Sequence, residues 1–242
     1  QRDQFRILNE LLEPALADSG IRRMKLETAA QRAREVADRW FQNEVLAVLS
    51  PQTLYHDLPF PMLQGLQLHL CVRLEKLPEP SVPGSAPSMQ ADGPGWQFSV
   101  IPLGRVINRM ITLPTEKGYG FVLLEDLVKA HIDEFFPGRK VIECTTFRIT
   151  RNADVQLRED AAPDLMIGME EVLESRRQSR CVRLELSSDA SDETIAYLTE
   201  TLGVTSQDLF RVDGPLDLTY LFQLVGIEGF RSLRSEPWPP QG

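Results

Sequence analysis

The chain has 242 residues, of which 42% are hydrophobic, 25% charged and 7% aromatic. This composition supports a packed core and excludes a disordered, a collagen-like or a disulfide-stapled chain. The 35 acidic residues outnumber the 26 lysines and arginines, which gives a formal net charge of -9. A general nucleic-acid-binding surface is therefore excluded, and a polyanionic ligand would have to bind at a local cluster of basic residues.

The three cysteines, Cys71, Cys144 and Cys181, are far apart in the sequence and form no CxxC pair or zinc-type spacing. Each falls in an apolar, strand-like stretch, so we expect small buried thiols in a reducing cytosol. No apolar run reaches the roughly 18 residues of a membrane span, and no signal peptide opens the sequence. We therefore expect a cytoplasmic protein without a transmembrane segment.

Residues 1–50 have a helical pattern. The apolar residues of the first helix recur at helical spacing: Phe5, Leu8, Leu12 and Leu16. Pro14 is expected to bend or end this helix, and Ser19-Gly20 to break the chain after it. A second helix is predicted over residues 28–46, with Pro51 beyond its end.

Residues 66–74 alternate strictly between apolar and polar side chains, which predicts a strand with one face toward a core. Residues 76–95 are rich in proline and glycine and predict a long mobile loop. Because a second strand is predicted over residues 96–103, this loop is expected to join two antiparallel neighbours.

The second half of the chain alternates between helix and strand patterns. Helices are predicted from Leu124 to Pro137-Gly138, around 165–173, after an N-cap at Ser191, and over 216–225; strands are predicted over 121–123, 141–150 and 182–186. Thr205 and Asp208 are spaced as a capping box for one further short helix. The expected fold class is α+β: a mostly antiparallel sheet packed with helices and preceded by an N-terminal helical segment.

No catalytic motif stands out. The sequence contains no GxxxxGK[ST] or GxGxxG phosphate loop and no GxSxG nucleophile elbow. The three histidines, His56, His69 and His131, show no metal-ligand spacing, so each is interpreted as structural or surface-exposed. From the residues alone we expect neither a catalytic residue nor a metal site.

Two segments rich in arginine and aspartate are the best candidates for a site. Arg148 and Arg151, followed by Asp154, come at the end of a predicted strand, and a guanidinium can bind phosphate or carboxylate with two parallel hydrogen bonds. Arg211 and Asp213 have the same composition ahead of a Gly-Pro turn. The alternative interpretation of both segments is an arginine–aspartate ion pair that closes a turn.

These segments resemble a known family. Three segments occur in the order typical of the head domain of bacterial polyphosphate kinase, the type with two phospholipase-D-like catalytic halves. They are Phe147-Arg148-Ile149-Thr150-Arg151-Asn152-Ala153-Asp154, then Val182-Arg183-Leu184-Glu185, then Phe210-Arg211-Val212-Asp213-Gly214-Pro215-Leu216. The resemblance is specific from about residue 98 to residue 225. It implies that 51–230 form the head domain, that 1–50 end the preceding helical domain, and that 231–242 are a linker toward catalytic domains.

The resemblance also implies an activity. The family transfers the terminal phosphate of ATP reversibly to inorganic polyphosphate, with Mg²⁺ and through a phosphohistidine, which is a form of nucleophilic catalysis. The family's catalytic histidines belong to C-terminal domains, so no catalytic residue is transferred to this chain and the fragment alone is expected to be inactive. The head domain's implied roles are homo-oligomerisation and shaping a polyphosphate tunnel, for which Arg148 and Arg151 are candidate contacts. Asp154, Arg211 and Asp213 are candidate structural residues.

A second hypothesis remains open from the sequence. The same fold could serve as a stand-alone interaction or scaffold module without enzymatic activity. The coding sequence beyond Gly242 discriminates the two, because histidine-bearing catalytic domains there would identify a kinase and a stop codon would favour the module.

Overall fold

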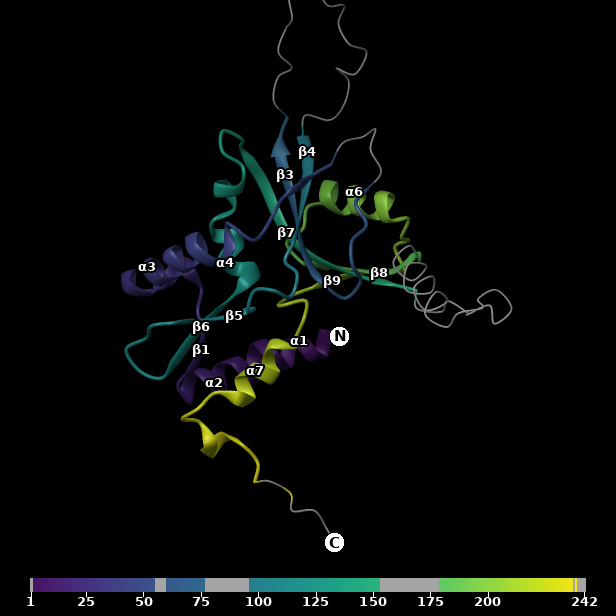
Figure 1. Cartoon of the computed structure of the whole chain (residues 1–242). Coiled ribbons are helices and arrows are strands. Elements are labelled where there is room, and N and C mark those ends of the chain that lie inside the picture. Colours follow the sequence, from purple (N-terminus) through teal and green to yellow (C-terminus); the bar gives the residue numbers. More distant parts are fainter. Residues whose placement is uncertain (1, 55–59, 77–95, 153–178, 237, 239–242) are drawn as a thin grey trace, which may run out of the picture.

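The computed structural model describes residues 2–54, 60–76, 96–152, 179–236 and 238. The helices are α1 (Arg2–Ile7), α2 (Glu13–Asp18), α3 (Gln31–Trp40), α4 (Leu124–Ala130), α6 (Asp192–Leu202) and α7 (Tyr220–Gly226). The strands are β1 (Ile21–Arg23), β2 (Gln52–Thr53), β3 (Leu68–Glu75), β4 (Trp96–Pro102), β5 (Met110–Leu113), β6 (Tyr119–Leu123), β7 (Val141–Arg151), β8 (Cys181–Ser187) and β9 (Leu209–Val212). The expected α+β class is confirmed (Figure 1).

A six-stranded sheet, in the order β2-β4-β3-β7-β8-β9, forms the centre of the fold. All its neighbouring strands are antiparallel except β8 and β9, which are parallel. β3 and β4 pair directly, from His69 opposite Pro102 to Glu75 opposite Trp96. The prediction that the Pro/Gly-rich segment joins two antiparallel neighbours is therefore confirmed, although residues 77–95 themselves lie outside the described part of the chain.

A smaller sheet, in the order β1-β6-β5, attaches the N-terminal helices to the rest of the fold. β1 follows α2 and runs parallel to β6, with Ile21 opposite Tyr119. The chain just before β1 approaches the start of β6 closely: the carbonyl of Gly20 accepts a hydrogen bond from the amide of Tyr119 at 2.7 Å. Gly118 has φ +81°, and a Cβ there would lie 2.1 Å from that same carbonyl oxygen, so only glycine fits.

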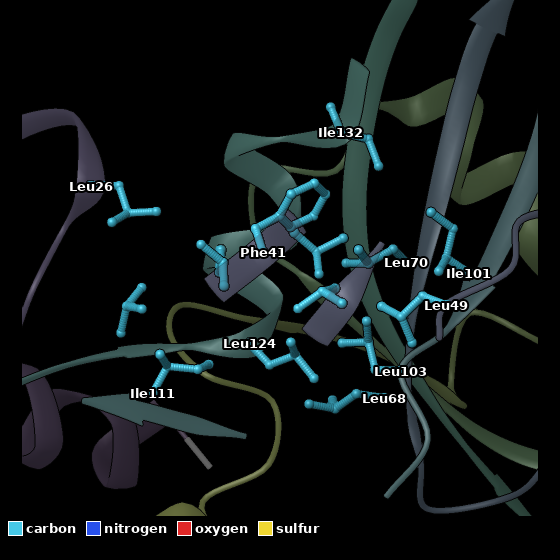
Figure 2. Packing of buried hydrophobic residues seen from close by; sticks show 14 of the residues in the cluster. Leu26, Phe41, Leu49, Leu68, Leu70, Ile101, Leu103, Ile111, Leu124 and Ile132 are labelled. Carbon is cyan, nitrogen blue, oxygen red and sulfur yellow. The ribbon is translucent and has the colours of Figure 1, made fainter. Parts of the chain in front are cut away.

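Helices cover both faces of the large sheet (Figure 1). On one face, α3 and α4 pack over the β3 side chains Leu70 and Val72, and Figure 2 shows the buried side chains that gather around Phe41 there. On the other face, α6 packs through Leu198 against the β7 side chain Phe147. The two hydrophobic clusters reach the ends of the strands, where Leu68 and Cys181 are still buried beside polar residues.

Two sequence predictions need correction, and a third is narrowed. β3 has two buried faces rather than one, because His69 and Cys71 are each about 1% exposed beneath the second layer. Asp208 does accept hydrogen bonds from the amide and hydroxyl of Thr205, but the chain then enters β9 and not a helix. Of the two outcomes expected at Pro14, a bend or an end, the helix does not end there: it continues to Asp18, with a π-helical turn at Leu8–Leu12 before the proline.

Other predictions hold. Ser191 caps α6 by accepting a hydrogen bond from the amide of Thr194, and the left-handed residue after the helix is Gly203. The predicted helix around residues 165–173 lies outside the described residues. Among the residues that the structure describes, no helix is both long and apolar enough to cross a membrane.

Candidate functional site

Arginines gather at the edge of the large sheet where β3 and β8 begin and β7 ends. There, Arg148 pairs with Glu185 across β7 and β8, and Arg151 ends β7 opposite Cys181. The cross-strand register brings Arg183 into the same region, opposite Thr150. The three arginines outnumber Glu185, so this edge has a local excess of positive charge in an acidic chain, which is the feature that a polyanion would need.

Arg148 is tied to a buried carboxylate. Its Nε and Nη2 both lie 2.7 Å from Oε2 of Glu185, whose side chain is 2% exposed. Arg183 also donates to Glu185, at 3.1 Å, and stacks on Phe210 with its guanidinium carbon 3.6 Å from the ring centre. One carboxylate therefore positions two arginines, and the close partner of Arg148 is a glutamate of the next strand, not an aspartate that closes a turn.

Arg109 is a third fixed cation of this region. Its Nε donates to Glu125 at 3.0 Å, Nη2 donates to the same carboxylate, and Nη1 donates to the backbone carbonyl of Asp217. Its guanidinium carbon also lies 5.5 Å from the ring centre of Tyr220. Burial works against the charged form, but the hydrogen bonds and charge of Glu125 outweigh it and raise the pKa of Arg109. Arg109 stays a cation at any physiological pH.

Asp217 connects these arginines into one network. Its Oδ2 lies 3.6 Å from Nη1 of Arg109, and its Oδ1 lies 3.8 Å from Nη1 of Arg148. Positive and negative side chains therefore alternate along the network, in the order Arg183, Glu185, Arg148, Asp217, Arg109 and Glu125. This network joins β8, β7, the segment between β9 and α7, the residue before β5, and α4.

Arg151 has a different environment. Its Nε donates to the carbonyl of Leu63 at 3.0 Å and its Nη1 donates to the carbonyl of Ser179 at 2.7 Å. Both acceptors are neutral, so the positive charge of Arg151 is held in place without being cancelled by them. Of the two predicted contacts, Arg151 is therefore the more available to an anion.

The predicted structural residues lie elsewhere. Arg211 donates to the carbonyls of Ser188 and Ala190, at 2.6 and 3.2 Å, and so ties the end of β9 to the turn after β8. Asp213 contributes its backbone carbonyl, which accepts from the side chain of Asn9 at 2.9 Å. Asp154 lies outside the described residues.

A polar cavity of about 280 Å³ opens beside this network, under the segment that follows β9. Arg23 and Lys129 face four acids across it: Glu125, Asp126, Asp189 and Asp213. Partial burial, together with the neighbouring Glu125, raises the pKa of Asp126 to about 6. The excess of acids makes this cavity a poor site for a polyphosphate, in contrast to the arginine-rich edge.

The described histidines have structural surroundings. His69 is buried and stacks on Phe147, and burial lowers its pKa to about 4. His131 stacks on Phe41 with ring centres 4.4 Å apart and bonds Asp38 at 2.9 Å. Within the described residues, no three His, Cys, Asp or Glu side chains are grouped to hold a metal ion.

The comparison with protein families decides the identity of the chain. The family model for the polyphosphate kinase middle domain matches residues 32–224. The chain belongs to the polyphosphate kinase family. The match includes every residue of the arginine network, from Arg109 to Asp217.

Curated relatives agree. A polyphosphate kinase of Rhodopirellula baltica is 44% identical to this chain, and one of Pseudomonas aeruginosa is 33% identical; each alignment covers 98% of this chain. The chain spans about a third of these polyphosphate kinases, 34% and 33% of their lengths. The crystal structure of polyphosphate kinase from Porphyromonas gingivalis has the same fold, with a TM-score of 0.69 at 19% identity over 98% of this chain and 32% of that one.

Only part of this site is visible in the sequence of the polyphosphate kinase chain. Arg148 and Arg151 are predicted because they lie three residues apart at a strand end, whereas Arg109, Glu185 and Asp217 are not predicted. Their partners are distant in sequence: the bond from Arg109 to Asp217 spans 108 residues. A single buried charge in an apolar strand, such as Glu185, is the signal that could have indicated an ion pair.

Proposed function

We propose that this chain is the head-domain part of an enzyme that reversibly transfers the terminal phosphate of ATP to inorganic polyphosphate through a phosphohistidine. The observation that carries the proposal is the family match over residues 32–224. In this proposal 51–230 are the head domain, 1–50 end the preceding helical domain and 231–242 are a linker. Mg²⁺ and ATP act with the remaining two-thirds of the enzyme, and this chain supplies no catalytic residue.

The role proposed for this part is to guide polyphosphate along the arginine-rich sheet edge. Arg151 keeps its charge beside neutral acceptors, and Arg148 stands three residues before it on the same strand. Each guanidinium is held by other groups, so little side-chain freedom remains to be lost when an anion binds. Fixed cations near the end of one strand suit a flexible chain of phosphates, which can bend around the strand end, better than one deep pocket does.

A second proposed role is self-association in the cytoplasm. Phe222 and Val225, on α7, are 81% and 63% exposed, and Leu11, on the helical segment before α2, is 61% exposed. α2 and α7 pack together through Leu16, so their outer surfaces are neighbours. Exposed apolar side chains of this size favour an interface, here with a second copy of the chain.

The test of the catalytic proposal is an assay of the full-length protein that contains this chain. We expect ATP- and Mg²⁺-dependent synthesis of polyphosphate and a phosphohistidine that maps outside these 242 residues. The absence of synthesis would overturn the proposed activity, and a phosphohistidine formed by the 242-residue chain alone would overturn the division of roles.

A further inference from the structure

Asp217 lies between two arginines that come from different parts of the fold. Nη1 of Arg109 faces one carboxylate oxygen at 3.6 Å, and Nη1 of Arg148 faces the other at 3.8 Å. Each arginine therefore presents the same terminal nitrogen to the same small anion. An aspartate with one guanidinium on each oxygen occupies the position that a bridging anionic ligand would take.

The remaining nitrogens of both arginines are fixed by other carboxylates. Glu125 binds Nε and Nη2 of Arg109, and Glu185 binds Nε and Nη2 of Arg148. Since Glu125 and Glu185 have side chains only 5% and 2% exposed, they belong to the protein interior. Nη1 of Arg109 also donates to the backbone carbonyl of Asp217, so the two Nη1 groups keep their positions when only the carboxylate of Asp217 moves away.

The contacts of Asp217 are looser than those of the two glutamates. Charge-assisted hydrogen bonds are about 2.7–2.9 Å long, so the two arginine contacts of Asp217 are too long for this class. Its Oδ1 already accepts the amide of Thr219 at 2.9 Å, which keeps the side chain on its own segment. The side chains of Asp217, Arg109 and Arg148 are 19%, 14% and 21% exposed, so solvent reaches the site.

We propose that Arg109 and Arg148 form a binding site for one phosphoryl unit of an inorganic oligophosphate, and that Asp217 fills this site as an internal anion until the ligand displaces it. The inference rests on the proposed function, which supplies the ligand class. A phosphoryl group carries more charge and more acceptor oxygens than a carboxylate and suits two guanidiniums well. Displacement leaves Glu125 and Glu185 in place and changes only the segment between β9 and α7.

This arrangement selects for long anions. A tethered carboxylate competes at an effective concentration on the order of millimolar, so a single free phosphate displaces it poorly. An oligophosphate long enough to reach Arg151, around the end of β7, gains from several sites at once. We therefore expect affinity to rise steeply from orthophosphate to tripolyphosphate.

The test compares two aspartate variants of the 242-residue chain that change net charge equally. Asp217→Asn removes the internal anion, whereas Asp213→Asn neutralises an exposed aspartate four residues earlier whose side chain contacts neither arginine. Tripolyphosphate binding is measured by calorimetry at fixed ionic strength. The site predicts that Asp217→Asn binds about tenfold more tightly than Asp213→Asn, and equal affinity in the two variants would overturn it.

A wild-type measurement keeps the inference testable if Asp217→Asn does not fold. The Nε–H resonances of Arg109 and Arg148 are followed by NMR during a tripolyphosphate titration, with the exposed Arg39 on α3 as the reference. Both site resonances should shift together while Arg39 does not, and unchanged resonances would overturn the site. These binding readouts do not use catalysis, so their failure is distinguishable from failure of the proposed kinase activity.

Discussion

Arg148 and Glu185 form an ion pair between neighbouring strands in which the acid is buried and the base is partly exposed. Both nitrogens of the arginine that face Glu185 lie 2.7 Å from Oε2, and the exposed fractions of the two side chains are 21% and 2%. A buried charge of this kind is stable only while it is paired. The pair therefore makes the arginine-rich edge depend on one carboxylate in the sheet.

Replacing Glu185 tests this dependence. Glu185→Gln removes the charge that both Arg148 and Arg183 contact, so we expect a loss of about 3 kcal/mol in the free energy of unfolding, as for other broken buried pairs. Urea unfolding followed by circular dichroism measures it. The control is Glu200→Gln, an exposed residue of α6 that should change stability by less than about 0.5 kcal/mol. Equal stability of the two variants would mean that the pair contributes nothing to the fold.

Glu143 predicts a loss of stability in acid. Burial raises its pKa, but hydrogen bonds from Ser191 and Thr194 at the start of α6 outweigh burial, and its pKa lies below the usual 4.5. A lowered pKa in the folded state gives stability that is present above pH 4.5 and is lost as pH falls through the folded-state value.

Chemical unfolding between pH 7 and pH 3 measures this contribution. We expect Glu143→Gln to be less stable than wild type at pH 7 and the difference to shrink toward pH 3. Glu44→Gln, at an exposed position, is the control and should follow the wild-type curve. A difference that stays constant with pH would show that ionisation of Glu143 does not stabilise α6.

Asp126 predicts the opposite pH dependence. Burial and the charge of Glu125 raise its pKa to about 6 from 3.8, so the folded state binds the proton more tightly than the unfolded state does. Its ionisation therefore destabilises the fold as pH rises from about 4 to above 6.

Replacing the acid by an amide should remove this penalty. At pH 7.5 we expect Asp126→Asn to be more stable than wild type by at most about 1 kcal/mol, because the side chain is 41% exposed and solvent screens the effect. Below pH 4 the two should unfold alike, and melting temperatures at both pH values measure this. A variant less stable than wild type at pH 7.5 would show that the contact with Arg23, at 3.7 Å, dominates instead.

Gly118 tests the junction between the N-terminal helices and the small sheet. A Cβ at this position would meet the carbonyl of Gly20 at 2.1 Å, and the backbone has φ +81°. Gly138 is the matched control, because it has φ +74° but nothing within 4 Å of a Cβ. Gly138→Ala should cost about 1 kcal/mol for the left-handed conformation, and Gly118→Ala should cost at least about 2 kcal/mol because overpacking is added. Denaturation midpoints of the two variants compare these losses of stability. Equal losses would contradict the close approach of Gly118 to the carbonyl of Gly20.

The parts of the fold that could be predicted are those in which the local pattern and the tertiary structure agree. β3, β4, β7 and β8 were recognised because each is long and rich in apolar or β-branched residues. β1, β5 and β9 were missed because three or four residues carry too little periodicity. Each of these exists through pairing with a partner distant in sequence, as β1 does with β6.

The site, like the fold, could be predicted from the sequence only in part. The arginines at the end of β7 are visible in the sequence because they are close together, and the two chemistries open to them were phosphate binding and an ion pair. The carboxylate that Arg148 meets is set by strand register, which places Glu185 opposite it. Asp217 comes from a segment beyond β9 that no local pattern connects to the sheet. Partners of this kind are found only when the topology is known.

Arg151 gives the sharpest test of the proposed polyphosphate contact. Its charge is held by two neutral carbonyls, so an anion at the sheet edge would gain the full attraction of the guanidinium. Arg151→Gln in the full-length enzyme should weaken polyphosphate binding about tenfold, the value of one charged hydrogen bond. It should also reduce the slope of log affinity against log salt by about one unit, as for one lost phosphate contact with a nucleic acid.

The matched control for Arg151 is Arg39→Gln, which removes the same charge from an exposed position of α3 on the other side of the molecule's core. We expect it to leave the salt slope unchanged. Melting temperatures of both variants are measured alongside, because the bonds from Arg151 to Leu63 and Ser179 also connect three segments of the fold. Unchanged polyphosphate affinity together with a large fall in melting temperature would show that Arg151 is only a structural tie between these segments.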